Sequence, residues 1–337
     1  MNADSAKAPI DRKVFYPRLS APSAEEFGNW SWSHQTADPH SFAQIIAPSF
    51  TPDRAAPKFH QRPAMSAPPT LDLNAYFARI GYTGSRKPTL AVLRALHLQH
   101  MMAVPTENLD VLLGRRISIE PAAIEQKLVH ERRGGYCFEQ NSLFRDVLLS
   151  LGFNVTPLLA RVRWQVPANY TTGLTHTVLQ VEIEGRSWLV DVGMGGVGPT
   201  GPLALDPDIV QSTPHEPRRF LQRADKLSHQ LRSGADWLDI YEFSRTVPVP
   251  IDFEISNWYS CTNPKAFFMN NLVVTLVQPD RRVIIYNCDF TYRYPDGRAE
   301  TRNIESPEEL LALLAEHFGL NFPAGTRFGQ RGAAWPV

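Results

Sequence analysis

The hydrophobic residues change their spacing at Gly152, and this change restricts the folds that the chain can adopt. Before Gly152 they recur every three or four residues, as in amphipathic helices, and after it they tend to alternate, as in strands. The helical spacing, with Gly81 and Gly152 as stops, predicts helices over residues 71–81, 89–98, 121–132 and 137–152. The folded part of the chain is therefore expected to begin as a helical bundle.

The second half of the chain is predicted to be rich in strands. Strands are expected over residues 155–164, 177–183 and 187–192, and extended segments over residues 251–258, 272–278 and 283–288. Residues 202–245 show no clear period. Ser306, Pro307 and Glu309 then form the start signal of a last helix. The order of elements predicts an α+β protein: helices, a strand-rich barrel or sheet, and a small α/β unit.

The first 69 residues differ from the rest, because they contain ten of the 28 prolines. Proline at this frequency breaks helices and central strands. We expect a proline-rich, mostly disordered extension over residues 1–65. The alternative is an arm that docks on the body through aromatic residues such as Trp30 and Trp32.

Charge and cysteine content exclude several classes of protein. The 34 basic and 34 acidic residues balance, whereas nucleic-acid binding and electrostatic membrane binding need a basic surplus. No stretch approaches the roughly 20 apolar residues of a membrane span, and the N-terminus lacks the apolar region of a secretory signal. Three cysteines indicate a reducing compartment. We therefore expect a cytoplasmic protein that binds neither nucleic acid nor membrane.

Cys137 follows two glycines and begins a predicted helix, in the string RRGGYCFEQN. The N-terminus of a helix favours a thiolate, and its free N–H groups can stabilise an oxyanion. A lone cysteine at this position is also compatible with a simple buried helix cap. The partners found further along the chain favour a nucleophile.

His176 and Asp191 are expected to lie together in a β-hairpin. If Glu184 and Gly185 are the central turn residues, the residue numbers of two opposed positions add up to 369. Asp191 then faces Val178 and is the diagonal neighbour of His176 on the same face of the hairpin. A slip of one residue would place them on opposite faces. With Cys137 they form a cysteine-protease-like set of nucleophile, base and orienting acid.

The glycine-rich segment of residues 193–198, here called the glycine turn, follows Asp191 directly. Its backbone could approach a ligand phosphate, but it lacks the Lys-Ser/Thr pair of a P-loop and no helical pattern follows it. A flexible turn at the entrance of a site is the simpler interpretation.

Together these segments resemble the arylamine N-acetyltransferase family. The resemblance rests on RGGYCFEQN around Cys137, on Thr-His-Thr-Val at residues 175–178 and on Asp-Val-Gly-Met-Gly at residues 191–195. PTENL at residues 105–109 is similar to the family's Pro-Phe-Glu-Asn-Leu, and NWYS at residues 257–260, with Pro264 and Phe268, is similar to the segment that leads into its third domain. The resemblance extends from about residue 66 to the C-terminus.

The resemblance implies a helical bundle over residues 66–152 that carries the cysteine, a β-barrel over 153–262 that carries the histidine and aspartate, and an α/β lid over 263–337. It implies ping-pong acetyl transfer from acetyl-CoA to an arylamine, arylhydrazine or arylhydroxylamine, as in xenobiotic metabolism. Cys137 would be acetylated, His176 would be the general base and acid, and Asp191 would orient His176. The expected protein needs no metal and is a monomer or a weak homo-oligomer.

The same resemblance suggests further site residues. Contacts to CoA are expected from Gly193, Gly195, Gly196, Ser260, Thr262 and Phe268, and Phe268 would also line the acceptor pocket. Arg133, Glu107 and Asn141 would form a buried polar cluster behind the nucleophile. Thr106 replaces the family's phenylalanine, which makes one wall of the acceptor pocket polar. Cys261 and Cys288 are expected to be bystanders, although Cys261 lies in the segment assigned to CoA.

Three other interpretations remain open. A cysteine hydrolase or a transglutaminase-like enzyme uses Cys, His and Asp in the same chain order. An amide synthase of a biosynthetic pathway would share the triad and accept a carrier-bound acyl chain. A catalytically silent scaffold would have no need to keep Cys137 and His176.

Overall fold

The computed structural model describes residues 71–329, so the predicted N-terminal extension lies outside the described residues. Three of the predicted helices are present: α1 (Leu73–Ile80), α2 (Leu90–Ala103) and α5 (Cys137–Ser150). Gly81 ends α1 with a positive φ of 70°, and the Thr89 side chain caps α2 by accepting the N–H of Val92. The predicted stop at Gly81 and start at Thr89 are therefore confirmed, whereas α2 continues to Ala103, five residues beyond its predicted end at Leu98.

The predicted helix over residues 121–132 is divided in two. An α-helical turn, α4 (Pro121–Glu125), continues into a π-helical turn, η3 (Gln126–His130). The Arg79 side chain of α1 is buried against this turn and donates to the carbonyl of Leu128 at 3.0 Å and of Arg132 at 3.3 Å. A side chain from another helix thus holds the irregular end of this segment.

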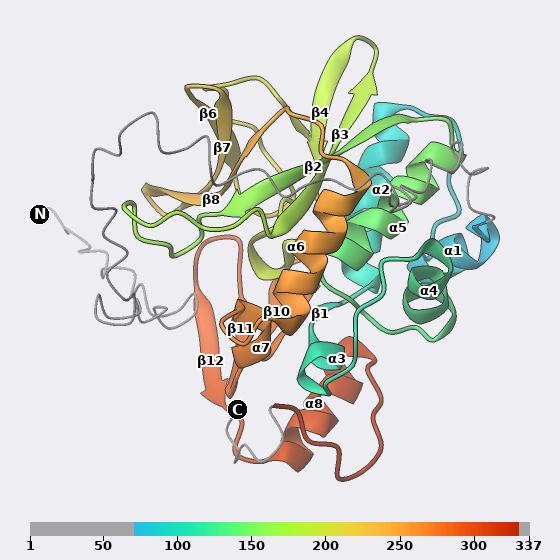
Figure 1. Cartoon of the computed structure of the whole chain (residues 1–337), viewed down its shortest axis with the longest axis vertical. Helices are drawn as coiled ribbons and strands as arrows, with labels where there is room; N and C mark the ends of the chain where they lie inside the picture. The colour runs from blue at the N-terminus through green and yellow to red at the C-terminus, as the bar shows by residue number, and fades with distance from the viewer. Residues whose placement is uncertain (1–70, 330–337) are drawn as a thin grey trace, which may run out of the picture. The chain divides into compact units, whose positions relative to one another are not determined.

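A seven-stranded antiparallel sheet follows the helices, with the strand order β5-β4-β3-β2-β8-β7-β6 (Figure 1). The strands are β2 (Asn154–Val162), β3 (His176–Ile183), β4 (Arg186–Val190), β5 (Leu203–Ala204), β6 (Arg218–Arg223), β7 (Lys226–Ser233) and β8 (Asp236–Ser244). Gln211 joins the two edge strands: its side-chain amide pairs with both backbone groups of Ala204 at 2.8 Å, while its own backbone pairs with Arg218. The sheet is therefore a nearly closed barrel.

The C-terminal part forms a second sheet of five strands, with the order β1-β9-β10-β11-β12. Its strands are β1 (Thr106–Glu107), β9 (Val273–Val277), β10 (Arg282–Tyr286), β11 (Asp289–Arg293) and β12 (Ala299–Asn303). The predicted last helix is α8 (Pro307–Phe318), whose Ser306 cap accepts the N–H of Glu309 at 3.1 Å. Since β1 comes from the helical region, that region and the C-terminal part of the described chain share one sheet.

The prediction of an extended segment over residues 251–258 is wrong. These residues belong to a helix, α6 (Pro250–Thr262), which crosses between the two sheets in Figure 1. Pro250 occupies the first helical position, and the Asp252 carboxylate accepts the N–H of Val249 at 2.9 Å. This start signal outweighs the strand preference of Ile251 and Ile255. Two short helices, α3 (Leu109–Leu112) and α7 (Phe267–Asn270), were not predicted.

The hydrophobic core is continuous across the helices and the barrel. One cluster of buried side chains includes Phe144 of α5, Val181 of β3, Val190 of β4 and Val277 of β9. A second cluster, with Phe220, Tyr241 and Phe243, fills the barrel. The division into three domains remains a prediction. Within residues 71–329, no helix is both long and apolar enough to cross a membrane.

The closure of the barrel by Gln211 generates a stability prediction. Gln211→Ala removes two hydrogen bonds to the backbone of buried Ala204, and each such bond contributes about 1 kcal/mol. The free energy of unfolding, measured with urea, is expected to fall by about 1–2 kcal/mol. The matched control Gln222→Ala loses only exposed bonds on β6 and should change it by less than about 0.5 kcal/mol. Equal midpoints for wild type and Gln211→Ala would contradict this role.

Candidate active site

Cys137 is buried at the first position of α5, as the sequence predicts. The path to it requires glycine at two positions. A Cβ on Gly134 would lie 2.2 Å from the carbonyl oxygen of Pro105, and one on Gly135 would lie 2.6 Å from a carboxylate oxygen of Glu139. That carboxylate accepts the N–H of Tyr136 at 3.0 Å and so caps the start of the helix. The sulfur is thereby held at the positive end of α5.

The β3–β4 hairpin has the predicted register. Glu184 and Gly185 both have positive φ, 53° and 77°, as a two-residue type I′ turn requires, and Leu179 pairs with Val190. The register places His176 and Asp191 on the same face, and His176 Nε2 lies 2.8 Å from Asp191 Oδ2. Both side chains are almost fully buried.

The three predicted residues meet. The Cys137 sulfur lies 3.8 Å from the carbonyl oxygen of Thr175, directly before His176, and Cys137 is one of the groups that raise the pKa of His176. A Cβ on Gly193 would lie 2.6 Å from the Cα of Cys137, so the glycine turn packs directly on the cysteine backbone. Because Asp191 binds Nε2, the other ring nitrogen of His176, Nδ1, is left for the thiol.

Burial and charge shift the pKa values of His176 and Asp191 in opposite directions. Burial alone would lower the pKa of His176, but the charge of Asp191 and hydrogen bonds to Asp191 and Cys137 raise it to about 10. Burial would raise the pKa of Asp191, but the charge and hydrogen bond of His176, with the Asn141 amide and the Gly193 N–H, lower it to about 2. At neutral pH the pair is therefore imidazolium and carboxylate.

Asn141 lies at a different place from the one predicted. It does not join Arg133 and Glu107; its Nδ2 donates to Asp191 Oδ1 at 3.0 Å and to the carbonyl of Thr177 at 2.7 Å, and its Oδ1 accepts the N–H of Val192. Asn141 is one helical turn beyond Cys137 and thus points to the same side of α5. Asn141 thus ties α5 to the β3–β4 hairpin.

The polar cluster behind the nucleophile is built from charged residues. Arg133 pairs with Glu107 at 2.9 Å, and Lys127 bridges Asp110 at 2.8 Å and Glu139 at 2.7 Å. Burial raises the pKa of Glu139 to about 7 against the lowering effect of Lys127. Because Glu139 also caps α5, this cluster supports the start of the helix that carries Cys137.

The residues predicted to contact CoA lie in two groups. Gly193, Gly195 and Gly196 are buried in the glycine turn, and a Cβ on Gly195 would lie 2.8 Å from Thr275 Oγ1 and 3.4 Å from Thr106 Cγ2. Ser260 is buried and donates to the carbonyl of Ser256, and Thr262 is exposed at the end of α6. The contacts to CoA remain predictions.

Phe268 packs on Tyr136, the residue before Cys137. Its ring lies 5.3 Å from that of Tyr136, and it borders the buried cluster that contains Cys137. Thr106 is half-buried in β1, opposite Thr275. Their proposed place in an acceptor pocket stays a prediction.

Two aromatic residues behind His176 were missed in the sequence. The ring of Tyr241 on β8 lies 5.1 Å from that of His176, and His229 on β7 lies 4.8 Å from Tyr241. Burial and the charge of Asp191 raise the pKa of Tyr241 well above its usual value, so its ring is neutral. Only an alternation of inward-facing and outward-facing residues along β7 and β8 could have indicated these two residues. The sequence of residues 202–245 shows no such period clearly.

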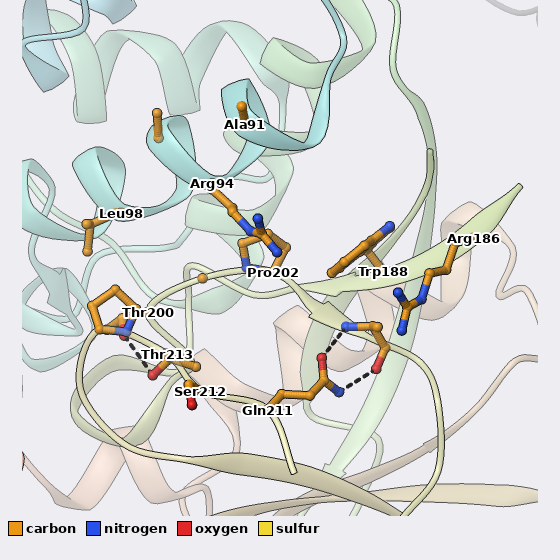
Figure 2. A pocket seen from close by; sticks show the side chains of 14 residues that line it. Ala91, Arg94, Leu98, Arg186, Trp188, Thr200, Pro202, Gln211, Ser212 and Thr213 are labelled. Carbon is orange, nitrogen blue, oxygen red and sulfur yellow. Dashed lines mark hydrogen bonds between the residues drawn. The ribbon is translucent and has the colours of Figure 1, made fainter. Parts of the chain in front are cut away.

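A cavity of about 730 Å³ lies elsewhere, between α2 and strands β4 and β5 (Figure 2). Trp188 lies between Arg94 and Arg186, whose guanidinium groups are 5.7 and 5.1 Å from its ring. The lining contains none of Cys137, His176 and Asp191. Among residues 71–329, no group of three or more His, Cys, Asp or Glu side chains is arranged to hold a metal ion.

Comparisons of the sequence and the structure with known proteins all indicate the same family. A family model described as N-acetyltransferase matches residues 89–326, and this places the chain among the acyltransferases. The arylamine N-acetyltransferase of Escherichia coli is 42% identical over 250 residues, which cover 74% of this chain and 88% of the relative. That of Mycobacterium tuberculosis is 39% identical over 267 residues, which cover 78% and 93%. The chain belongs to the arylamine N-acetyltransferase family.

Solved structures agree with this assignment. The arylamine N-acetyltransferase of M. tuberculosis superposes with a TM-score of 0.72 at 38% identity, over 74% of this chain and 94% of that one. The enzyme of Mycobacterium marinum in complex with CoA superposes with a TM-score of 0.71 at 38% identity, over 74% and 92%. The mixed helix-and-sheet fold with its nearly closed barrel is thus that of the family.

The buried ion pair predicts how stability depends on pH. Because folding raises the pKa of His176, its contribution is complete below about 6.5 and is lost as the pH rises toward 10. Because folding lowers the pKa of Asp191, that contribution is lost as the pH falls toward 2. His176→Gln should therefore lower the free energy of unfolding by about 3 kcal/mol near pH 6, and by progressively less toward pH 10.

The control for this measurement is His130→Gln, which removes a half-exposed histidine 3.6 Å from Glu125. It should change the free energy of unfolding by less than about 0.5 kcal/mol at every pH. A destabilisation by His176→Gln that is constant from pH 6 to 10 would show that no buried ion pair forms.

Proposed function

We propose that this chain transfers an acetyl group from acetyl-CoA to an arylamine, arylhydrazine or arylhydroxylamine through an acetyl-Cys137 intermediate. The observation that carries the proposal is the buried His176–Asp191 pair beside a thiol at the start of α5. A histidine of raised pKa beside a thiol can hold the thiol's proton as imidazolium, which leaves the sulfur as a thiolate nucleophile.

In the first half-reaction the Cys137 sulfur attacks the thioester carbonyl of acetyl-CoA. A new carbon–sulfur bond forms at Cys137, the bond to the CoA sulfur breaks, and the imidazolium of His176 gives its proton to the departing CoA thiolate. Cys137 is the first residue of α5, and the N–H groups in the first turn of this helix can stabilise the oxyanion of the tetrahedral intermediate.

In the second half-reaction the acceptor nitrogen attacks the acetyl-Cys137 carbonyl. The carbon–nitrogen bond forms as the bond to the cysteine sulfur breaks, and the now neutral His176 takes the proton from nitrogen. Throughout both steps Asp191 keeps the ring oriented through Nε2, so that Nδ1 faces the sulfur. One histidine thus serves as acid and then as base.

The acceptor is expected to enter beside Phe268 and Thr106. Phe268 borders the cluster that contains Cys137, and the half-buried Thr106 adds a polar group where the family usually has a phenylalanine. This wall favours acceptors that carry a hydrogen-bonding group near the amine. The glycine turn, Ser260 and Thr262 are the proposed contacts of CoA.

The intermediate can be observed directly by intact mass. Purified protein mixed with acetyl-CoA should gain one acetyl group, and an added arylamine should remove it. Cys137→Ala should gain none. Cys261→Ala, which removes a half-buried thiol that borders the same cluster, is the matched control and should gain one.

Three outcomes would overturn the proposal. An adduct that persists in Cys137→Ala would assign the nucleophile elsewhere. Cleavage of a peptide amide without adduct would favour a hydrolase. Loading only by longer, carrier-bound acyl chains would favour an amide synthase.

A further inference from the structure

Four buried charged residues lie outside the chemistry described so far. Glu216 contacts three arginines, Arg218 of β6, Arg282 of β10 and Arg293 of β11, and all four residues are at most 5% exposed. Glu216 Oε2 lies 2.8 Å from both Arg218 and Arg282, and Oε1 lies 3.1 Å from both Arg282 and Arg293. We call these four residues the Glu216 cluster.

One carboxylate cannot balance three buried guanidinium groups, so the cluster carries an excess of two positive charges. Buried charge of this kind persists only where hydrogen bonds replace water. Here the replacement comes from the glycine turn: the three arginines donate to four consecutive carbonyl oxygens, those of Gly195, Gly196, Val197 and Gly198. The cluster therefore holds the turn by its carbonyl side.

The other end of the same turn reaches the proposed active site. The Gly193 N–H donates to Asp191 Oδ1 at 2.9 Å, and the Gly193 backbone packs on Cys137. Only three residues, 192–194, separate the first arginine-bound carbonyl, that of Gly195, from Asp191, whose carboxylate binds His176. Since Arg282 and Arg293 belong to the second sheet, the connection also runs from that sheet to the barrel.

We propose that the Glu216 cluster is a positioning device, which holds the glycine turn so that Gly193 keeps Asp191 aimed at His176. This inference rests on the proposed function of Cys137, His176 and Asp191. None of the four residues touches the reacting atoms; Glu216 acts by keeping the three arginines in place, and the arginines act by keeping the turn.

The test needs a variant that keeps the charge and loses the geometry. Arg293→Lys does this, because Arg293 Nη2 donates to both the Gly196 carbonyl and Glu216, and a lysine side chain is one bond too short to place its nitrogen there. Glu216→Gln disturbs the cluster more, but it also changes its charge, because it leaves the three arginines with a neutral partner. The matched control is Arg302→Lys, an exposed arginine of β12 in the same sheet that pairs with Glu309.

The measurement is the rate of acetyl loading of Cys137 from acetyl-CoA as a function of pH, by intact mass in a single turnover. At high pH this rate falls as His176 loses its proton, and we call this part of the pH profile the alkaline limb. The titratable and charged groups that face this ring are Asp191, Cys137 on α5 and Tyr241 on β8, with His229 on β7 and Arg218 on β6 behind Tyr241. Arg293→Lys leaves all of these unchanged.

If the Asp191 carboxylate is held less firmly, it raises the pKa of His176 by a smaller amount. The alkaline limb of Arg293→Lys should therefore move to lower pH by about half a unit or more. Loss of positive charge alone would move it to higher pH. Arg302→Lys should match wild type. Thermal unfolding, recorded in parallel, separates a loss of stability from the shift of the limb.

An unchanged limb in Arg293→Lys, with only a lower melting temperature, would overturn the inference and leave the proposed function intact. Insoluble protein from both cluster variants would assign the cluster to folding and would also overturn it. Failure of wild type to load acetyl would instead overturn the proposed function.

Discussion

A buried imidazolium–carboxylate pair is the constraint on which the rest of this structure depends. His176 and Asp191 are removed from water, and a pair like this persists only where its remaining hydrogen-bonding groups are satisfied. Asp191 Oδ2 binds His176, and Oδ1 accepts the Asn141 amide and the Gly193 N–H. The partners come from α5, from β3 and from the turn after β4, so three segments must converge for the pair to form.

That convergence also explains why the cysteine lies where it does. Asn141 is part of the same helix that begins at Cys137, so the hydrogen bond that orients Asp191 also brings the helix start against the hairpin. Gly193 allows contact with the Cys137 backbone that any Cβ would prevent. The N-terminus of a helix, a histidine and a carboxylate are thus assembled by the interactions that stabilise the fold.

The sequence predicted what depends on local rules. The hairpin register followed from Glu184 and Gly185, and the start of α5 followed from the glycines before Cys137. Helix α6 was missed because the strand preference of Ile251 and Ile255 concealed the Pro250 start signal. Asn141 was assigned to the wrong partners, and the Glu216 cluster was not seen. The contacts of Asn141 with Asp191, and of Glu216 with Arg282 and Arg293, join residues 50 to 77 positions apart, and no local pattern encodes such contacts.

The most direct test of the central claim is a titration of the His176 ring by carbon NMR in protein labelled at histidine, with its resonance assigned by its loss in His176→Gln. The buried pair predicts an imidazolium at pH 7.5 that titrates near pH 10, and a neutral ring at pH 7.5 in Asp191→Asn. A His176 ring in wild-type protein that is already neutral at pH 7.5, or one that titrates identically in Asp191→Asn, would contradict the account.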